Sequence, residues 1–306
     1  MAQSGISADL SLETRAAVLV EAIPYIRRFS GQVIVVKYGG NALGARAADG
    51  VDQEAAEAAA LARFAQDIVL MVSVGMHPVV VHGGGPQIGA LMSRLGKTPV
   101  FVDGLRVTDA ETLDIARMVL VGKVNRDIVG ALNVHAPLAV GLSGEDASFI
   151  TVTERDPALG FVGDVVGVDA SVPGRLVSGG FVPVIATIGS GAGGQAYNVN
   201  ADTVAGAVAE AMGAEKLIFL TDVPGILADR HDPGSHLRRL SADELDALVE
   251  GGSIGEGMIP KARACTGAVR GGVRSAHVLD GRIPHVLLLE LLSDAGVGTM
   301  IRERRR

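Results

Sequence analysis

Short runs of apolar, β-branched residues alternate along the chain with longer segments whose apolar residues recur every three or four positions. The short runs predict buried strands, and the longer segments predict helices that pack on them. Such an alternation is typical of a parallel sheet covered on both faces. Strands are predicted at residues 33–36, 78–81, 138–142, 182–188, 216–220 and 276–279, and helices at 53–74, 86–95, 110–121, 200–212 and 242–250.

Two segments depart from this alternation. Residues 151–168 are richer in Thr, Asp and Gly, which predicts an antiparallel hairpin inserted into the α/β pattern. Near the N-terminus, five apolar residues at steps of four and three predict a helix, which Pro24 is expected to kink or divide. The stripe consists of Leu12, Ala16, Leu19, Ile23 and Ile26. Spacing alone favours a helix that packs on its own subunit, and the alternative is an arm that packs on a neighbouring subunit.

The chain has 306 residues and a net charge of −7, with 48% hydrophobic and 20% charged residues. This length fits one large α/β unit or two lobes, and the composition argues against a disordered chain. A single cysteine, Cys265, excludes a disulfide framework or a cysteine-rich zinc module and is typical of a reducing cytoplasm. The acidic balance and an aromatic content of 3% argue against a general binder of nucleic acid or of anionic membranes.

Neither a targeting signal nor a membrane segment is expected. Residues 1–10 contain no Lys or Arg, so the basic start of a secretory signal is missing. The longest stretch without acidic or basic residues, 68–93, is interrupted by Gly and Pro residues that would break a membrane helix. We therefore expect a cytoplasmic protein.

Two glycine-rich segments directly follow predicted strands. The first is Lys37-Tyr38-Gly39-Gly40-Asn41, and the second is His82-Gly83-Gly84-Gly85-Pro86-Gln87. Ligands of open parallel sheets bind beyond the carboxyl ends of the strands, where glycines let backbone N–H groups approach an anion. One such loop could be a simple turn. Two of them, with a lysine at the rim, favour a phosphate site.

The common nucleotide-binding fingerprints do not fit these segments. In the second loop, Ile88 stands where the third glycine of the dinucleotide pattern belongs. The segment that ends in Gly96-Lys97-Thr98 resembles the end of a P-loop, but Leu91 occupies the position of its first glycine. A nucleotide site in this chain must therefore be of another type.

Four further polar segments lie at or near the ends of the predicted elements. They are residues 104–109 (Gly-Leu-Arg-Val-Thr-Asp), 197–202 (Tyr-Asn-Val-Asn-Ala-Asp), 220–225 (Leu-Thr-Asp-Val-Pro-Gly) and 257–261 (Gly-Met-Ile-Pro-Lys). Together with the two glycine loops, these motifs resemble the amino acid kinase family, most closely its branch that phosphorylates N-acetyl-L-glutamate. The resemblance covers residues 32–301.

The resemblance implies an α/β fold with an open, mostly parallel eight-stranded sheet sandwiched by helices. It divides the chain into an N-terminal helical arm (1–30), an N-lobe that binds the acyl acceptor and forms the dimer (31–213), and a C-lobe that binds ATP (214–306).

A phosphotransferase reaction is implied as well. MgATP would phosphorylate the side-chain carboxylate of N-acetyl-L-glutamate in arginine biosynthesis, with Mg²⁺ held mainly by phosphates and water. The pKa of a glutamate side chain is about 4.3, so the acceptor is ionised at neutral pH and needs no general base. Catalysis then depends on positioning and on cations that stabilise the charge of the transferring group.

By the same resemblance, Lys37 and Lys261 would contact the phosphoryl group from the two lobes, and Asp202 would orient both by ion pairing. The implied acceptor site consists of Gly83, Gly84, Arg106, Asn198 and Asn200, and the implied ATP site of Lys37, Gly39, Gly40, Thr221, Asp222, Gly225 and Lys261. No residue is expected to bind a metal directly. The alternative for either lysine is a solvated surface amine, and for Arg106 a surface ion pair with Asp103 or Asp109.

Regulation by arginine is implied too, because some members of the family are inhibited by arginine and form hexamers through an N-terminal helix that residues 11–29 resemble. The implied L-arginine site consists of Tyr25, Lys216, His277, Glu290 and Gly296. Each of these residues could instead be an ordinary surface or loop residue. The assembly would be a homodimer or a homohexamer built as a trimer of dimers.

Two other functions stay open at this point. One is a kinase of the same fold for another small carboxylate, such as aspartate or glutamate. The other is a catalytically silent scaffold that senses an amino acid. Intact Lys37, Lys261 and Asp202 argue against the scaffold.

Overall fold

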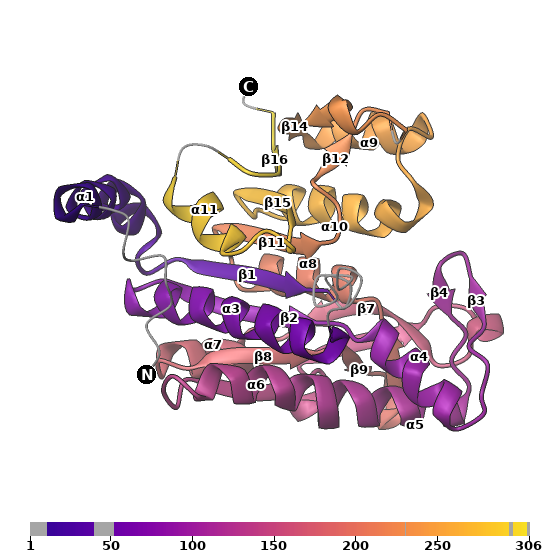
Figure 1. Ribbon diagram of the computed structural model, residues 1–306. Coiled ribbons are helices and arrows are strands. Elements are labelled where there is room, and N and C mark those ends of the chain that lie inside the picture. The colour runs from indigo at the N-terminus through magenta and orange to yellow at the C-terminus, as the bar shows by residue number, and fades with distance from the viewer. Residues whose placement is uncertain (1–10, 40–51, 230, 294–295, 305–306) are drawn as a thin grey trace.

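The computed structural model describes residues 11–39, 52–229, 231–293 and 296–304, with the backbone alone for Pro233 and Glu256. An eight-stranded sheet forms its centre (Figure 1). In spatial order the strands are β14 (Arg239–Ser241), β16 (Thr299–Arg302), β15 (Ser275–Asp280), β11 (Lys216–Thr221), β1 (Val33–Tyr38), β2 (His77–His82), β8 (Val182–Ala186) and β5 (Ala139–Ser143). Neighbouring strands pair in parallel except β15 and β16, so the expected mostly parallel sheet is confirmed.

Helices cover both faces of this sheet, because its buried strands are apolar on both sides. One face packs against α3 (Gln53–Ser73), α4 (Gly85–Arg94), α5 (Ala110–Arg117), α6 (Asn125–Asn133) and α11 (Val286–Leu292). The other face packs against α7 (Ser171–Ser178), α8 (Ala201–Ala211), α9 (Ala242–Glu250) and α10 (Ile259–Arg270). Alternate residues of β1 enter the two cores, with Ile34 and Val36 in one and Val35 in the other.

A second, smaller sheet closes on itself beside the large one. It contains β6 (Ile150–Glu154), β7 (Val162–Val168), β9 (Ile188–Ser190) and β10 (Ala196–Val199). The antiparallel pairing of β6 with β7 confirms the hairpin predicted at residues 151–168. The single strand predicted at 182–188 is wrong, since the chain leaves the large sheet after Ala186 and enters the small one at Ile188.

The helix predicted at residues 110–121 is part of a longer helical segment. It begins as α5, continues as a π-helix η1 (Met118–Val124), and ends as α6 at Asn133. Short 3-10 turns lie at η2 (Asp146–Ser148), η3 (Pro157–Leu159), η4 (Ala192–Gly194), η5 (Pro233–Ser235) and η6 (Glu256–Met258). Two small hairpins are formed by β3 (Phe101–Val102) with β4 (Leu105–Arg106) and by β12 (Ile226–Leu227) with β13 (His236–Leu237).

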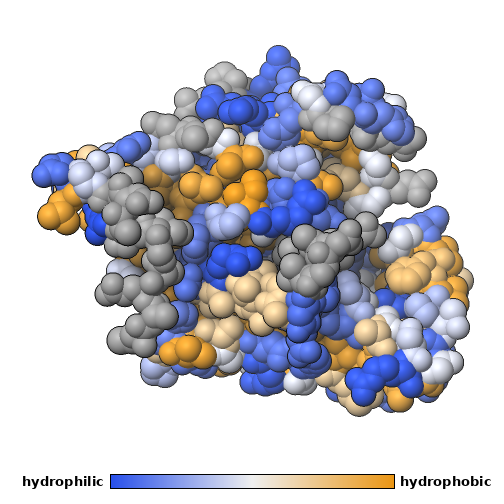
Figure 2. All heavy atoms as spheres, in the orientation of Figure 1, coloured by the Kyte–Doolittle hydropathy of each residue, from blue (hydrophilic) through white to orange (hydrophobic). Residues whose placement is uncertain are grey.

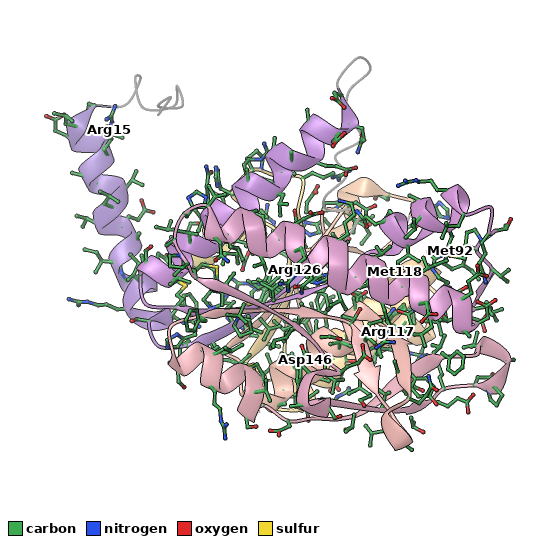
Figure 3. All side chains as sticks on the ribbon, turned by 90° about the horizontal axis from the view of Figure 1, so that it is seen from below. Arg15, Met92, Arg117, Met118, Arg126 and Asp146 are labelled. Carbon is green, nitrogen blue, oxygen red and sulfur yellow. The ribbon has the colours of Figure 1, made fainter. Side chains whose placement is uncertain are left out.

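The first helix, α1 (Leu12–Phe29), projects from the body of the molecule, with Arg15 near its outer end (Figures 1 and 3). Pro24 lies inside the helix without dividing it. Leu12, Leu19 and Ile23 remain 76%, 70% and 42% exposed. The expectation that this stripe packs on its own subunit is therefore wrong for most of its length.

Among the described residues, no helix combines the length and the apolar character that a membrane crossing requires.

Candidate functional site

The carboxyl ends of β1 and β2 lie side by side and bring two predicted motifs together. Lys37 pairs with Val81, and β2 ends at His82, directly before the three glycines that begin α4. The first amide groups of a helix have no partner within it and can bind an anion. Gly40 of the first motif lies outside the described residues.

Asp202 stands between two lysines from different elements. Lys37 Nζ lies 2.9 Å from Asp202 Oδ1, and Lys261 Nζ donates to Oδ2 at 3.0 Å. All three side chains are largely buried, so the alternative of solvated surface amines is wrong. Asp202 thus pairs with both ammonium groups, and its role in orienting them for the reaction stays a prediction.

Two helices place this ion-pair cluster. Asp202 lies in the first turn of α8 and Lys261 in the first turn of α10, and the two helices pack against each other. The positive end of α8 stabilises the carboxylate. Lys261 Nζ also lies 5.0 Å from the centre of the Phe219 ring on β11, which fixes it further.

Burial and charge act against each other in the cluster. Burial lowers the pKa of Lys37, although the charge of Asp202 opposes the shift. Burial alone would raise the pKa of Asp202, but Lys37 and Lys261 together hold it below its usual value. Two ammonium groups that share one carboxylate leave a net positive charge, which suits a phosphate group.

A cavity of about 230 Å³ opens beside Lys37 and Asp202. Every residue predicted for the acceptor site lines it: Gly83, Gly84, Arg106, Asn198 and Asn200. Thus residues far apart in the sequence, from five elements or loops, converge on one space of the size of a small metabolite.

Arg106 contacts no carboxylate within the described residues, so the expected alternative of an ion pair with Asp103 or Asp109 is wrong. Its Nη2 donates to the Gly85 carbonyl at 2.9 Å, and its guanidinium carbon lies 4.7 Å from the centre of the Phe101 ring. Figure 2 shows the apolar surface over the β3–β4 hairpin, where Phe101 is exposed. The charge of Arg106 is therefore available to an anion in the cavity.

Asn198 and Asn200 differ in how many of their side-chain hydrogen-bonding groups are already in use. Within the described residues, the side chain of Asn198 makes one hydrogen bond, a long one of 3.4 Å from Nδ2 to Thr108 Oγ1. Asn200 caps α8, with its Oδ1 accepting from the N–H groups of Asp202 and Thr203 at 2.9 and 3.2 Å. The helix therefore occupies the Asn200 oxygen, and the contact of Asn200 with a substrate stays a prediction that its Nδ2 would have to supply.

The residues predicted for the adenosine side lie on the same edge of the sheet. Thr221 ends β11, and Asp222 accepts a hydrogen bond from its hydroxyl at 3.3 Å. A side chain at Gly39 would lie 3.0 Å from Lys37 Nζ and 3.1 Å from the Leu220 carbonyl, so this loop approaches both closely. None of Thr221, Asp222 and Gly225 lines the cavity beside Lys37.

Gly225 has a packing role of its own. Its φ is +150°, and a side chain there would collide with His236 and Thr299. Ile226 N–H donates to Thr299 Oγ1 at 2.8 Å directly after it.

The family of the chain follows from a comparison with family models, in which residues 32–280 match the one described as the amino acid kinase family. The chain belongs to the amino acid kinase family. The lysine pair and the two glycine loops lie within the residues that match this family of kinases.

Known relatives cover almost the whole chain. A protein named acetylglutamate kinase from Symbiobacterium thermophilum is 54% identical over 296 residues, which are 94% of this chain and 97% of the relative. Among solved structures, an N-acetylglutamate synthase from Neisseria gonorrhoeae, complexed with coenzyme A and N-acetyl-glutamate, is 27% identical with a TM-score of 0.80. The match covers 95% of this kinase and 64% of the synthase chain. The same synthase complexed with coenzyme A and L-arginine has a TM-score of 0.79 and 28% identity, over 94% and 65% of the two chains.

Several lining residues of the cavity were not predicted. Phe101, Gly85, Leu120 and Thr187 all face it. Gly85 belongs to the second glycine-rich loop, so this motif could have predicted its place in the site. Thr187, between β8 and β9, and Leu120, in the π-helix, belong to no motif, and only their place in the fold identifies them.

A second buried cluster lies toward the amino ends of β11 and β15, at the edge of the sheet opposite the lysine pair. Glu290 Oε1 on α11 lies 2.8 Å from His277 Nδ1 and 3.7 Å from Lys216 Nζ. Lys216 Nζ lies 5.2 Å from the centre of the Phe29 ring, at the end of α1. Three of the five predicted arginine-site residues are thus brought together.

The other two members of that set lie near the same elements. Tyr25 is half-buried on α1, and Gly296 is exposed, with φ +52°, directly before Val297, whose N–H donates to Glu290 Oε2 at 3.1 Å. Burial lowers the pKa of Lys216 to about 8 and that of His277 to about 4. His277 is therefore neutral at neutral pH.

Proposed function

We propose that this kinase transfers the γ-phosphoryl group of ATP to the side-chain carboxylate of N-acetyl-L-glutamate, a step of arginine biosynthesis. The observation that carries the proposal is the convergence of Lys37 and Lys261 on Asp202, beside a cavity that Arg106 lines. The name of the 54% identical relative supports this acceptor.

The chemistry needs no general base, because a glutamate side chain is ionised at neutral pH. The obstacle is the repulsion between an anionic acceptor and a triphosphate. Lys37 and Lys261 lower it by placing two positive charges where charge develops during transfer. Asp202 holds these charges in place, and each of its two oxygens lies within 3.0 Å of an ammonium group, which disfavours a role as a base.

N-acetyl-L-glutamate carries a second carboxylate, which requires a cation of its own. Arg106 offers a planar fork for a bidentate contact, and it lines the cavity while one of its nitrogens donates to the Gly85 carbonyl. We infer that Arg106 and Asn198 hold this second carboxylate, while the amides at the start of α4 face the reacting end.

ATP would bind along the edge of the sheet that Gly39, Thr221 and Asp222 share, in a C-lobe of residues 214–306, with the acceptor in an N-lobe of residues 31–213. Within the described residues, no three carboxylate, His or Cys side chains gather around one point. We infer that Mg²⁺ would arrive with ATP, held by phosphate oxygens and water.

The proposal is tested by ADP release with N-acetyl-L-glutamate, aspartate, glutamate or UMP as acceptor. We expect turnover with the first, and rates at the background level with the other three. The Lys261→Met variant serves as the control for contaminating ATPase activity. A rate with aspartate or glutamate above that with N-acetyl-L-glutamate would contradict the proposed acceptor, and turnover with none of them would favour a silent scaffold.

We further propose feedback inhibition by L-arginine at the cluster of Lys216, His277 and Glu290. A buried carboxylate beside the end of α1 can bind a guanidinium, once it exchanges its contacts with His277 and Lys216. The synthase of the same fold with L-arginine bound supports this effector. Activity should fall as L-arginine rises, and Glu290→Gln should relieve the inhibition. An unchanged rate through millimolar L-arginine would contradict it.

A further inference from the structure

His82 is buried completely at the end of β2, directly before the glycine loop, and it does not line the cavity. Both of its ring nitrogens have partners. Nδ1 lies 3.1 Å from the Gly83 carbonyl oxygen, and Nε2 lies 3.0 Å from Nδ2 of Asn125. Neither the proposed chemistry nor the proposed acceptor site makes use of this histidine.

These partners determine which nitrogen of His82 carries the proton. A carbonyl oxygen only accepts, so Nδ1 must donate to Gly83, and in the neutral ring Nε2 must accept from the Asn125 amide. The second N–H of that amide donates to the Val184 carbonyl at 2.8 Å, and its oxygen accepts from Arg126. Burial lowers the pKa of His82 to about 4, which keeps the ring neutral at neutral pH.

The hydrogen bond to Gly83 fixes the orientation of one peptide of the glycine loop. In a trans peptide the carbonyl and the N–H point in opposite directions. With the Gly83 carbonyl turned toward buried His82, the N–H of Gly84 points away from that ring. Gly83 and Gly84 line the cavity, whereas His82 does not. A flipped peptide would present a carbonyl oxygen to an anionic ligand instead.

The π-helix η1 supports the same loop from a second side. Asn125 N–H donates to the Leu120 carbonyl across the wide turn, which places Asn125 against His82 and Leu120 against the glycine loop. A side chain at Gly84 would lie 2.8 Å from Leu120 and 3.2 Å from Val124.

Strand β5 leaves space for Arg126, which ends the chain of hydrogen bonds from His82 through Asn125. A side chain at Gly141 would collide with Arg126 and with the Asn125 oxygen. Figure 3 shows Arg126 on the same long helix as Met118, at the start of the π-helix. The hydrogen-bond network thus joins β2, the long helix and β8 behind one peptide, and Gly141 of β5 leaves the space that Arg126 occupies.

We propose that His82 is a positioning residue, whose Nδ1–H holds the Gly83–Gly84 peptide so that the Gly84 N–H faces an anionic oxygen bound in the cavity. The identity of that oxygen, on the acceptor or on the transferring phosphoryl group, rests on the proposed function. The tautomer and the peptide orientation do not.

Two substitutions separate the two ring nitrogens. In His82→Asn the side-chain amide N–H takes the place of Nδ1–H and keeps the bond to Gly83, while in His82→Gln the amide reaches toward Asn125 and the bond to Gly83 is lost. We expect His82→Asn to keep kcat/KM within about fivefold of the unchanged kinase, and His82→Gln to lose about 30- to 100-fold, since one positioned donor is worth 10²- to 10³-fold. Melting temperatures check that both variants fold alike. Equal losses in two folded variants, or a smaller loss for His82→Gln, would overturn the proposal.

Nitrogen-15 NMR of the imidazole rings tests the same inference without turnover. At pH 7 the unchanged full chain should show His82 with a protonated Nδ1 and a bare Nε2, its signals assigned by their loss in His82→Asn or, where that variant does not fold, by their couplings to Gly83. The opposite tautomer would overturn the proposal even if N-acetyl-L-glutamate is the acceptor. If the unchanged kinase does not phosphorylate N-acetyl-L-glutamate, the proposed function is contradicted. The NMR spectrum still tests the tautomer of His82 in that case.

Discussion

At the scale of single residues, the site depends on a local excess of positive charge in a chain whose total charge is −7. Lys37 and Lys261 share one carboxylate, and Arg106 adds a third cation with no acidic partner among the described residues. Burial strengthens the field of these groups, because water screens it less than at the surface. An acidic protein can therefore still attract two anionic substrates to one place.

Replacing Lys37 by Met should lower kcat about 10²- to 10³-fold, because a charge aimed at the transferring group is lost. Lys123→Met is the matched control, since that lysine is exposed and its one ion pair in the described part of the chain is with Asp127, four residues along its helical segment. The kcat of the control should stay within about twofold of the unchanged kinase. Similar losses in both variants would contradict the assigned role of Lys37.

Acid should destabilise the fold through buried histidines. Burial lowers the pKa of His82 from its ordinary value of 6.5 to about 4. Between these two pH values, His82 is protonated in the unfolded chain and neutral in the folded chain. This contribution is complete above pH 6.5 or so and is lost as the pH falls toward 4, by about 2 kcal/mol between pH 7.5 and 5. Urea unfolding at fixed protein concentration measures the loss, which should be smaller in His82→Asn. Equal losses in the two proteins would contradict the assignment.

The sequence predicts which residues belong to the site where a motif contains them. It does not predict the role of a residue that depends on a hydrogen bond in the folded chain. Lys37, Asp202 and Lys261 follow from motifs in a fixed order. The oxygen of Asn200 serves the end of α8, and His82 serves a peptide of the glycine loop, because of contacts that spacing does not reveal. Those roles become visible only in the folded structure.

At the scale of elements, the apolar runs predict the parallel strands because both faces of such a sheet are buried. The break of the predicted strand 182–188 at Thr187 and the π-helix after α5 are not encoded in periodicity. Both depend on packing against partners that are distant in sequence, and both deliver residues to the cavity.

One contact between elements joins residues 218 positions apart. His285 begins α11 in the left-handed region, with φ +56°, and its Nδ1 lies 2.6 Å from Oδ1 of buried Asp67 on α3. Burial raises the pKa of Asp67, so the carboxylate depends on this partner. The pair fastens α11, which carries Glu290, to α3 on the same face of the sheet.

Removing this partner should destabilise the fold in a way that depends on the replacement. His285→Ala leaves Asp67 unpaired and keeps a strained backbone, so we expect a loss of about 1–3 kcal/mol. His285→Gly leaves Asp67 equally unpaired but tolerates a positive φ, so its loss should be smaller. Urea unfolding of both variants measures the two losses in the free energy of unfolding. A larger loss for His285→Gly than for His285→Ala would contradict the explanation.

At the scale of the whole molecule, the apolar stripe of α1 has no partner within the described residues over most of its length. Exposed apolar surface of this kind marks an interface. We propose that α1 packs on α1 of another subunit, which extends a homodimer to a homohexamer. The arm would then connect the assembly to the proposed L-arginine site at Glu290 through the contact between Phe29 and Lys216.

Introducing charge into the stripe should therefore reduce the mass of the assembly. We expect the double variant Leu19→Glu, Ile23→Glu to fall from hexamer to dimer in light scattering, with kcat unchanged in the absence of arginine. Val134→Glu, at a residue that is 82% exposed on another surface, should leave the mass unchanged. A double variant with the mass of the unchanged kinase would contradict the proposed arm.

The most direct test of the central claim is capture of the product by hydroxylamine, which converts an acyl phosphate to a hydroxamate. With ATP and N-acetyl-L-glutamate, the kinase should form one N-acetylglutamyl hydroxamate for each ADP, and Lys37→Met and Lys261→Met should lose both together. ADP release without hydroxamate would mean that the two lysines direct the phosphoryl group to water or to another acceptor, and would contradict the account.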